Sequence, residues 1–112
     1  MPAFVPDTGD LIWLTFDPQA GHEQAGRRPA LVLSPKPYNQ RSGLALVCPV
    51  TSQLKGYPFE VPLPPGCGVT GAILADHLKS LDWKARKTER IGRITPLILS
   101  GVLARLAPLL GY

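Results

Sequence analysis

The chain has 112 residues, room for one domain with a single hydrophobic core, and a formal net charge of +4. Its 45% hydrophobic and 18% charged residues exclude an intrinsically disordered chain. No apolar run reaches the length of a membrane span, and no basic region followed by an apolar core opens the sequence. We therefore expect a single cytoplasmic domain over residues 1–112, without membrane association.

The first half of the chain alternates β-like runs with polar connections. Residues 9–17 predict a strand, and the continuous apolar run 29–34 predicts a second strand that is buried on both faces. Residues 44–50 predict a third strand, and residues 38–43 before it a polar connection. Between the first two strands, residues 21–30 gather one carboxylate and two guanidiniums among turn residues, so we expect a loop there. Loops on a rigid sheet often carry chemistry.

The second half predicts more short strands and then a helix. Strands are expected at residues 59–63, 72–75 and 78–83, with a turn at 55–58, a loop at 64–68 and a basic edge at 85–91. Thr95 and Pro96 form a helix start, an N-cap followed by proline in the first turn. The apolar residues that follow have helical spacing; they are Leu99, Val102, Leu103, Leu106 and Leu110. Pro108 should end the helix, whose apolar surface needs cover from the sheet or from a partner chain.

These elements predict a mainly β domain with a C-terminal helix. The expected sheet is strongly bent and antiparallel, with about five to seven short strands. The chain contains 13 prolines and 11 glycines, which indicate many turns between short strands. This combination fits a small SH3-like barrel.

Cysteine and histidine are scarce and widely spaced. Cys48 lies in an apolar run and is expected in the core, whereas Cys67 lies in a Pro/Gly loop and is expected to be an exposed thiol. Only His22 and His77 accompany them, and no spacing fits a transition-metal site. We expect neither a metal nor another cofactor.

Positive charge is concentrated near the C-terminal helix. Between positions 84 and 93 one acid, Glu89, is outnumbered by basic residues, which are Lys84, Arg86, Lys87, Arg90 and Arg93. A basic strip of this kind favours polyanions such as nucleic acid. The alternative is an ordinary solvated surface.

Several separate motifs occur together in a characteristic order. They are VPDTGD (5–10), GHEQAGRRP (21–29), VLSP (32–35), PVTSQ (49–53), KGYPFEV (55–61) and ADHLKS (75–80). On these motifs the chain resembles the MazF/PemK family of toxin–antitoxin ribonucleases over nearly its whole length. The loop at 63–71 and the helix sequence diverge from the family pattern.

The resemblance implies a fold, an activity and partners. It implies a homodimeric toxin with an SH3-like barrel, a single endoribonuclease domain that cuts single-stranded RNA, including mRNA, at short sequence motifs. Cleavage would need no metal and would inhibit translation and growth. It also implies a cognate, MazE-like antitoxin protein that blocks the RNA groove.

The resemblance also suggests the catalytic residues. It makes Arg28 the strongest catalytic candidate, with Thr51 as its partner and Glu23 nearby. Arg28 can bind a phosphate with a bidentate fork and stabilise charge, and Thr51 can donate a neutral hydrogen bond. Glu23 can either orient Arg28 or take the proton of the 2′-hydroxyl, and both roles remain open. Without the family pattern, Arg27 and Arg28 could not be told apart.

Residues around this set are expected to bind RNA. Lysines would pair with phosphates, aromatic residues would stack on bases and polar residues would line the groove; these are Lys55, Lys79, Trp13, Phe16, Tyr57, Ser52 and Gln53. Trp13 fits the core equally well. Trp83 is expected in the core or at a dimer interface. His77 is not part of the family pattern and is not expected to be catalytic.

The expected chemistry is internal transfer. The 2′-hydroxyl of the substrate is already tethered near the phosphorus, so no metal-activated water is required. The products would be a 2′,3′-cyclic phosphate and a 5′-hydroxyl. The alternatives are a non-enzymatic toxin of the same fold that binds a protein such as a DNA topoisomerase, and an SH3-like adaptor. The Glu23, Arg28 and Thr51 set favours the nuclease.

Overall fold

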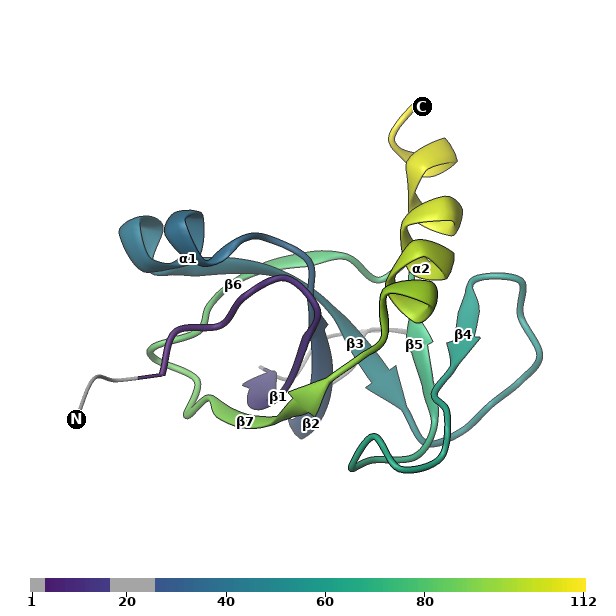
Figure 1. Ribbon diagram of the computed structural model, residues 1–112, viewed down its shortest axis with the longest axis horizontal. Helices are drawn as coiled ribbons and strands as arrows, with labels where there is room; N and C mark the ends of the chain where they lie inside the picture. The colour runs from purple at the N-terminus through teal and green to yellow at the C-terminus, as the bar shows by residue number, and fades with distance from the viewer. Residues whose placement is uncertain (1–3, 17–25) are drawn as a thin grey trace.

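The computed structural model describes residues 4–16 and 26–112 (Figure 1). Within these ranges the chain forms seven strands and two helices. In chain order they are β1 (Asp10–Phe16), β2 (Gly26–Val32), α1 (Lys36–Ser42), β3 (Leu44–Thr51), β4 (Glu60–Pro62), β5 (Ala72–Leu74), β6 (Lys79–Asp82), β7 (Glu89–Arg93) and α2 (Pro96–Leu109). The predicted mainly β domain with a C-terminal helix is confirmed.

The strands form one bent antiparallel sheet in the order β4-β5-β3-β2-β1-β7, with β6 also pairing β3. Strand β3 is the longest and holds the sheet together. It pairs β2 along one edge, while β6 and then β5 follow one another along the other edge. The bend within β3 lets the sheet curl in the barrel-like way that the short strands predicted (Figure 1).

Hydrophobic side chains fill both faces of the central strands. Successive side chains of a strand point to opposite faces. On one face Leu11, Leu31 and Cys48 pack with Val102 of α2. On the other face Ile12, Leu14, Phe16, Ala30, Val32 and Val47 pack with Trp83. The prediction that the apolar run in β2 is buried on both faces is confirmed, and so are core positions for Cys48 and Trp83.

Helix α1 replaces the polar connection predicted for residues 38–43, so that prediction was wrong. The helix lacks an apolar stripe and buries only Asn39. The Asn39 amide donates hydrogen bonds to the carbonyl oxygens of Pro6 (2.8 Å) and Ser34 (2.9 Å), and its oxygen accepts one from the Ser34 hydroxyl. A buried polar network of this kind leaves no hydrophobic periodicity for sequence analysis to find.

Two predicted boundaries also shift. Residues 26–28, expected in the loop before the second strand, belong to β2, because Gly26 and Arg27 pair with Phe16 and Thr15 of β1. Helix α2 begins as predicted: the hydroxyl of Thr95 accepts a hydrogen bond from the Ile98 N–H. It ends at Leu109 and not before Pro108, since a proline in the last turn removes only one helical hydrogen bond. Neither helix in the described ranges has the length and apolar character to cross a membrane.

Candidate functional site

A cleft opens where strands β2 and β3 stop pairing. Their ladder joins Val32 to Val47, Leu31 to Cys48 and Ala30 to Pro49. Continued by two residues, the same register would bring Arg28 opposite Thr51. The two strands instead separate there, and along its other edge β3 pairs with β5, where Thr51 faces Ala72. The separation leaves a cleft with a volume of about 370 Å³.

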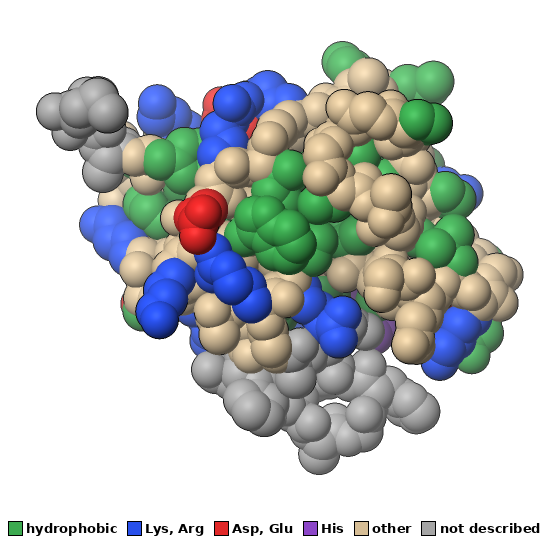
Figure 2. All heavy atoms as spheres, turned by 90° about the horizontal axis from the view of Figure 1, so that it is seen from below, with side chains coloured by type: hydrophobic (Ala, Val, Ile, Leu, Met, Phe, Trp, Pro, Cys, Tyr) green, Lys and Arg blue, Asp and Glu red, His purple; other side chains and the backbone are tan. Residues whose placement is uncertain are grey.

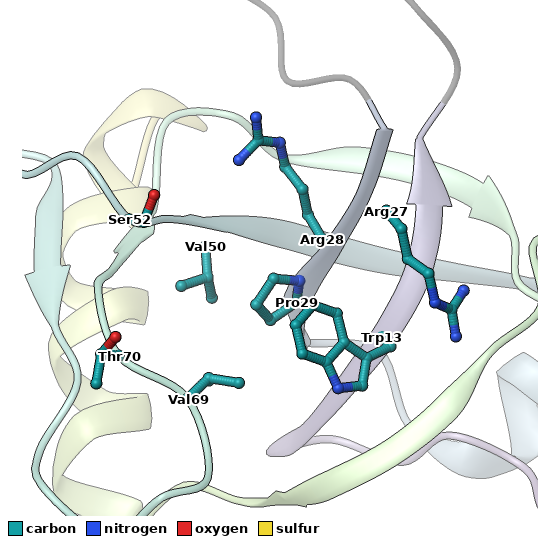
Figure 3. Close-up of a pocket in the computed structure, with 8 residues that line it drawn as sticks. All are labelled: Trp13, Arg27, Arg28, Pro29, Val50, Ser52, Val69 and Thr70. Carbon is teal, nitrogen blue, oxygen red and sulfur yellow. The ribbon is translucent and has the colours of Figure 1, made fainter.

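The cleft has apolar walls and a polar, cationic rim (Figure 3). Trp13 and Pro29 form one wall, and Val50 and Val69 face them. The other lining residues are polar or charged, namely Arg27, Arg28, Ser52 and Thr70. On the face that lies below β7 and β1 in Figure 1, hydrophobic side chains form a patch with Lys and Arg side chains at its edges (Figure 2). Apolar walls beside cations suit a ligand with flat rings on an anionic backbone.

The two neighbouring arginines have different surroundings. Arg27 Nη2 lies 2.6 Å from Glu89 Oε1 of β7, so Arg27 takes part in an ion pair across β1. Arg28 extends from β2 in the opposite direction (Figure 3), as strand alternation requires. Arg28 is half-buried on a strand, which corrects the expectation of an exposed loop residue. A residue held by a strand is positioned more precisely than one on a loop.

Thr51 is held on two sides at the end of β3. Its side chain is buried, and its hydroxyl accepts a hydrogen bond from the Gln53 N–H at 3.1 Å. This contact uses an oxygen lone pair, so the O–H proton can be donated to another acceptor. Gly71 lies so close that a Cβ there would be 2.1 Å from the Thr51 carbonyl oxygen. Only glycine allows this approach, which fixes the backbone of Thr51 beside the cleft.

The structure brings some expected RNA-binding residues to the cleft. Trp13 and Ser52 line it, and Gln53 follows directly along the chain. Lys55 and Tyr57 are exposed on the segment that continues from Ser52. Lys79 instead begins β6, where it pairs with Val47 and is half-buried.

Two expectations about the site need separate comment. Phe16 is only 2% exposed and belongs to the core with Ile12 and Leu14, so its expected role in base stacking was wrong. Glu23 lies outside the described residues, and its expected role stays a prediction.

Val69 and Thr70 are cleft residues that sequence analysis did not identify. They lie on the 63–71 loop, where the chain departs from the family pattern. The Leu63 N–H donates a hydrogen bond to the Gly71 carbonyl oxygen at 2.9 Å, and this bond joins the two ends of the loop. Its only sequence signal was a Pro/Gly-rich composition, which predicts a loop but not where the loop folds.

The basic strip is partly structural. Arg93 donates hydrogen bonds to Asp10 (3.1 Å) and to the Thr8 carbonyl oxygen (2.7 Å). Arg86 donates to the Thr15 carbonyl oxygen at 3.0 Å. The Lys84 ammonium lies 5.6 Å from the ring centre of Trp83. The two arginines brace β1, so the strip is not simply a row of side chains offered to a polyanion.

The two cysteines lie in different surroundings. Burial, followed by the nearby charge of Asp76, raises the pKa of the Cys48 thiol to about 12. Cys67 was expected to be exposed but is half-buried, because it packs against the hydrophobic core. Its thiol donates to the Val69 carbonyl oxygen at 3.1 Å. Across residues 4–16 and 26–112, no three His, Cys, Asp or Glu side chains group as ligands for a metal ion.

Comparison with known proteins identifies a family and close relatives. Residues 7–110 match the sequence profile of the family described as PemK-like, MazF-like toxin of type II toxin–antitoxin system. The chain is 50% identical over 108 residues to the endoribonuclease toxin MazF of Escherichia coli K12, covering 96% of each chain.

Solved structures agree with this relationship. The fold matches that of MazF from Deinococcus radiodurans with a TM-score of 0.94 and 56% identity, covering 98% of this chain and 100% of that one. A chain from the crystal structure of MazE–MazF of the same organism matches with a TM-score of 0.89 and 57% identity, covering 97% and 98%.

Proposed function

This chain belongs to the PemK-like, MazF-like toxin family of type II toxin–antitoxin systems, and we propose on that basis that it is an endoribonuclease whose active site is the β2–β3 cleft. One observation supports this location for the active site. Arg28 lines the cleft from β2, and Thr51 ends β3 at the matching position of the interrupted ladder. The names of the relatives as endoribonucleases support the activity.

The proposed substrate is single-stranded RNA, cut by internal transfer. The 2′-oxygen forms a bond to phosphorus while the bond from phosphorus to the 5′-oxygen breaks. The 2′-hydroxyl gives up its proton to a base, and the leaving 5′-oxygen gains one. The products are a 2′,3′-cyclic phosphate and a 5′-hydroxyl. The attacking oxygen belongs to the RNA, so the enzyme has to align it, move protons and stabilise charge.

The candidate residues have separate roles in this proposal. The Arg28 guanidinium binds the phosphate and stabilises its developing charge, and it can also protonate the leaving oxygen. The Thr51 hydroxyl donates a hydrogen bond to a non-bridging oxygen, because one of its lone pairs already accepts a hydrogen bond from the Gln53 N–H. Glu23 either orients Arg28 or takes the 2′-hydroxyl proton. Trp13 offers a half-buried ring face for a base.

The proposed partners are a second copy of the chain and an acidic antitoxin. Helix α2 leaves Leu97 and Leu103 exposed, an apolar surface that a second copy would cover. The MazE–MazF structure from Deinococcus radiodurans supports an antitoxin partner. A flexible acidic segment would suit the cationic rim of the cleft. Its affinity should fall as salt rises and fall further in Lys55→Glu; an affinity that changes with neither would contradict this partner.

Mapping the cut ends of a defined RNA tests the proposed function. Wild-type protein should cut at a few short sequence sites and leave cyclic phosphate and 5′-hydroxyl ends, at the same rate with and without EDTA. Arg28→Ala should leave the RNA intact. Intact RNA with the wild-type protein would contradict the activity, and a rate that needs added metal would contradict the mechanism.

A further inference from the structure

The segment from Ser52 to Pro58, here called the 52–58 loop, leads directly out of the cleft. Ser52 lines the cleft, and every residue of the loop is exposed. The loop carries Lys55 and Tyr57, two of the residues expected to contact RNA. An exposed segment of this length would ordinarily sample many conformations, and ordering it on binding would cost free energy.

A buried carboxylate holds the middle of this loop. Glu60, the first residue of β4, is only 8% exposed. Its carboxylate accepts hydrogen bonds from the Lys55 N–H at 3.1 Å and from the Gly56 N–H at 2.9 Å. Gly56 has a φ of 78°, a left-handed conformation that favours glycine at this turn. The Glu60 N–H also donates to the Tyr57 carbonyl oxygen at 3.1 Å.

The chemistry of this contact argues for a positioning role. A free carboxylate beside a phosphate-binding lysine would repel the phosphate. Glu60 is buried and directed at backbone N–H groups, so its charge is used in charge-assisted hydrogen bonds that favour one loop conformation.

A guanidinium from the C-terminal helix holds the end of the loop. Arg105 Nε donates to the Pro58 carbonyl oxygen at 3.0 Å, and Nη1 donates to the Gly101 carbonyl oxygen at 3.0 Å. Arg105 is the single charged residue in the sequence of α2. The hydrogen bond to Pro58 therefore ties the loop to the helix, and the bond to Gly101 within α2 fixes the orientation of the guanidinium.

We propose that Glu60 and Arg105 are positioning residues that hold the 52–58 loop, and with it Lys55, in the conformation that binds RNA. This inference rests on the proposed function, because it concerns the substrate-binding step of that reaction. A loop ordered in advance lowers the cost of binding without changing the reacting groups. Loss of either contact should therefore raise KM for RNA and leave kcat almost unchanged.

Hydrogen exchange tests whether the two residues hold the loop. The Lys55 and Gly56 amides should be protected in the wild-type protein, and their exchange should be at least about tenfold faster in Glu60→Gln. Arg105→Ala should speed exchange at the end of the loop, and Arg105→Lys should restore part of the protection. Arg41→Ala removes the same charge from the surface of α1 and should change nothing. Equal exchange in all variants would overturn the proposal.

Steady-state cleavage tests whether the held loop serves RNA binding. Arg105→Ala should raise KM about fivefold with kcat within about twofold. In a background with both Lys55→Ala and Tyr57→Ala the same substitution should have no further effect, because Arg105 would act through the RNA contacts of the loop. The inference would be overturned if the substitutions multiplied one another's effects on KM. It would also be overturned if Arg105→Ala lowered kcat and thermal stability together. If the wild-type protein cuts RNA and the Arg105→Ala and Glu60→Gln variants have the same KM as wild type, this inference alone is refuted. If the wild-type protein does not cut RNA, the proposed function is refuted.

Discussion

Arg27 Nη2 and Glu89 Oε1 lie 2.6 Å apart, and this ion pair ties β2 to β7 across the intervening strand β1. Trp13 lies on β1 between them, since it pairs with Pro29 on one side and with Glu89 on the other. The contact therefore assigns Arg27 to the sheet surface beside Trp13. The next residue, Arg28, extends the other way and is the candidate for chemistry.

Alanine substitutions at these two arginines should have very different effects. Arg28→Ala should lower the cleavage rate about 100- to 10,000-fold, because it removes the group that stabilises charge on the phosphate. Arg27→Ala should lower it less than about tenfold, since it breaks an ion pair that is largely exposed. Rate measurements on one defined RNA, with circular dichroism to confirm folding, compare the two. Equal losses, or an unfolded Arg28→Ala, would contradict the assignment.

Helix α2 should carry part of a homodimer interface. It buries Val102 and Leu106 against the sheet but leaves Leu97 80% exposed and Leu103 45% exposed. Leu103→Glu would place a charge in an apolar interface and should weaken the dimer at least about tenfold. Sedimentation at micromolar protein measures this. A wild-type chain that sediments only as a monomer would rule out the interface.

Asp7 should make stability depend on pH in the acid range. Its carboxylate accepts hydrogen bonds from the Lys36 N–H (2.9 Å) and the Thr8 N–H (2.8 Å). The Lys36 bond is the main cause that lowers the pKa of Asp7 below the ordinary value of 3.8. Because the folded-state pKa is depressed, this stabilisation is fully present above pH 3.8 and is lost as the pH falls through the lower, folded-state pKa.

Denaturant unfolding between about pH 5 and pH 2 measures this effect. Asp7→Asn should flatten the fall in the free energy of unfolding over that range, while still being less stable than wild type at neutral pH. A variant with the same pH dependence as wild type would show that the Asp7 carboxylate is not responsible.

The sequence predicted most clearly those elements that have an uninterrupted hydrophobic pattern. Strand β3 and helix α2 were expected within a few residues of their observed bounds. Both elements are held in place by apolar packing, because Cys48 and Val50 of β3 lie in one core with Val102 of α2. Thr95 and Pro96 also marked the start of α2, because capping depends on the local sequence alone.

Features that depend on distant contacts were missed. Helix α1 depends on the buried amide of Asn39, which binds Pro6 from the beginning of the chain. The start of β2 depends on its pairing with β1, so the turn residue Gly26 became part of a strand. Phe16 was expected to stack on bases, but the pairing of β1 with β2 places it in the core.

The candidate site was predictable only through the family motifs. Spacing alone could not separate Arg28 from Arg27, and because both line the cleft the choice of Arg28 stays a prediction from the family pattern. Val69 and Thr70 could not be identified, because their place in the cleft depends on how the 63–71 loop folds against β3. The role of Glu23 stays a prediction.

An RNA with a single modification tests most directly whether this cleft cuts RNA by attack of the substrate's own 2′-hydroxyl. Once a cut site is mapped, an RNA with one 2′-deoxy sugar just upstream of that phosphate is compared with the unmodified RNA, and binding is measured alongside cleavage. The modified RNA should bind with nearly the same affinity, stay intact, and compete with cleavage of the unmodified strand. Cutting of the modified RNA at the normal rate would contradict internal transfer, and with it the roles proposed for Arg28 and Thr51.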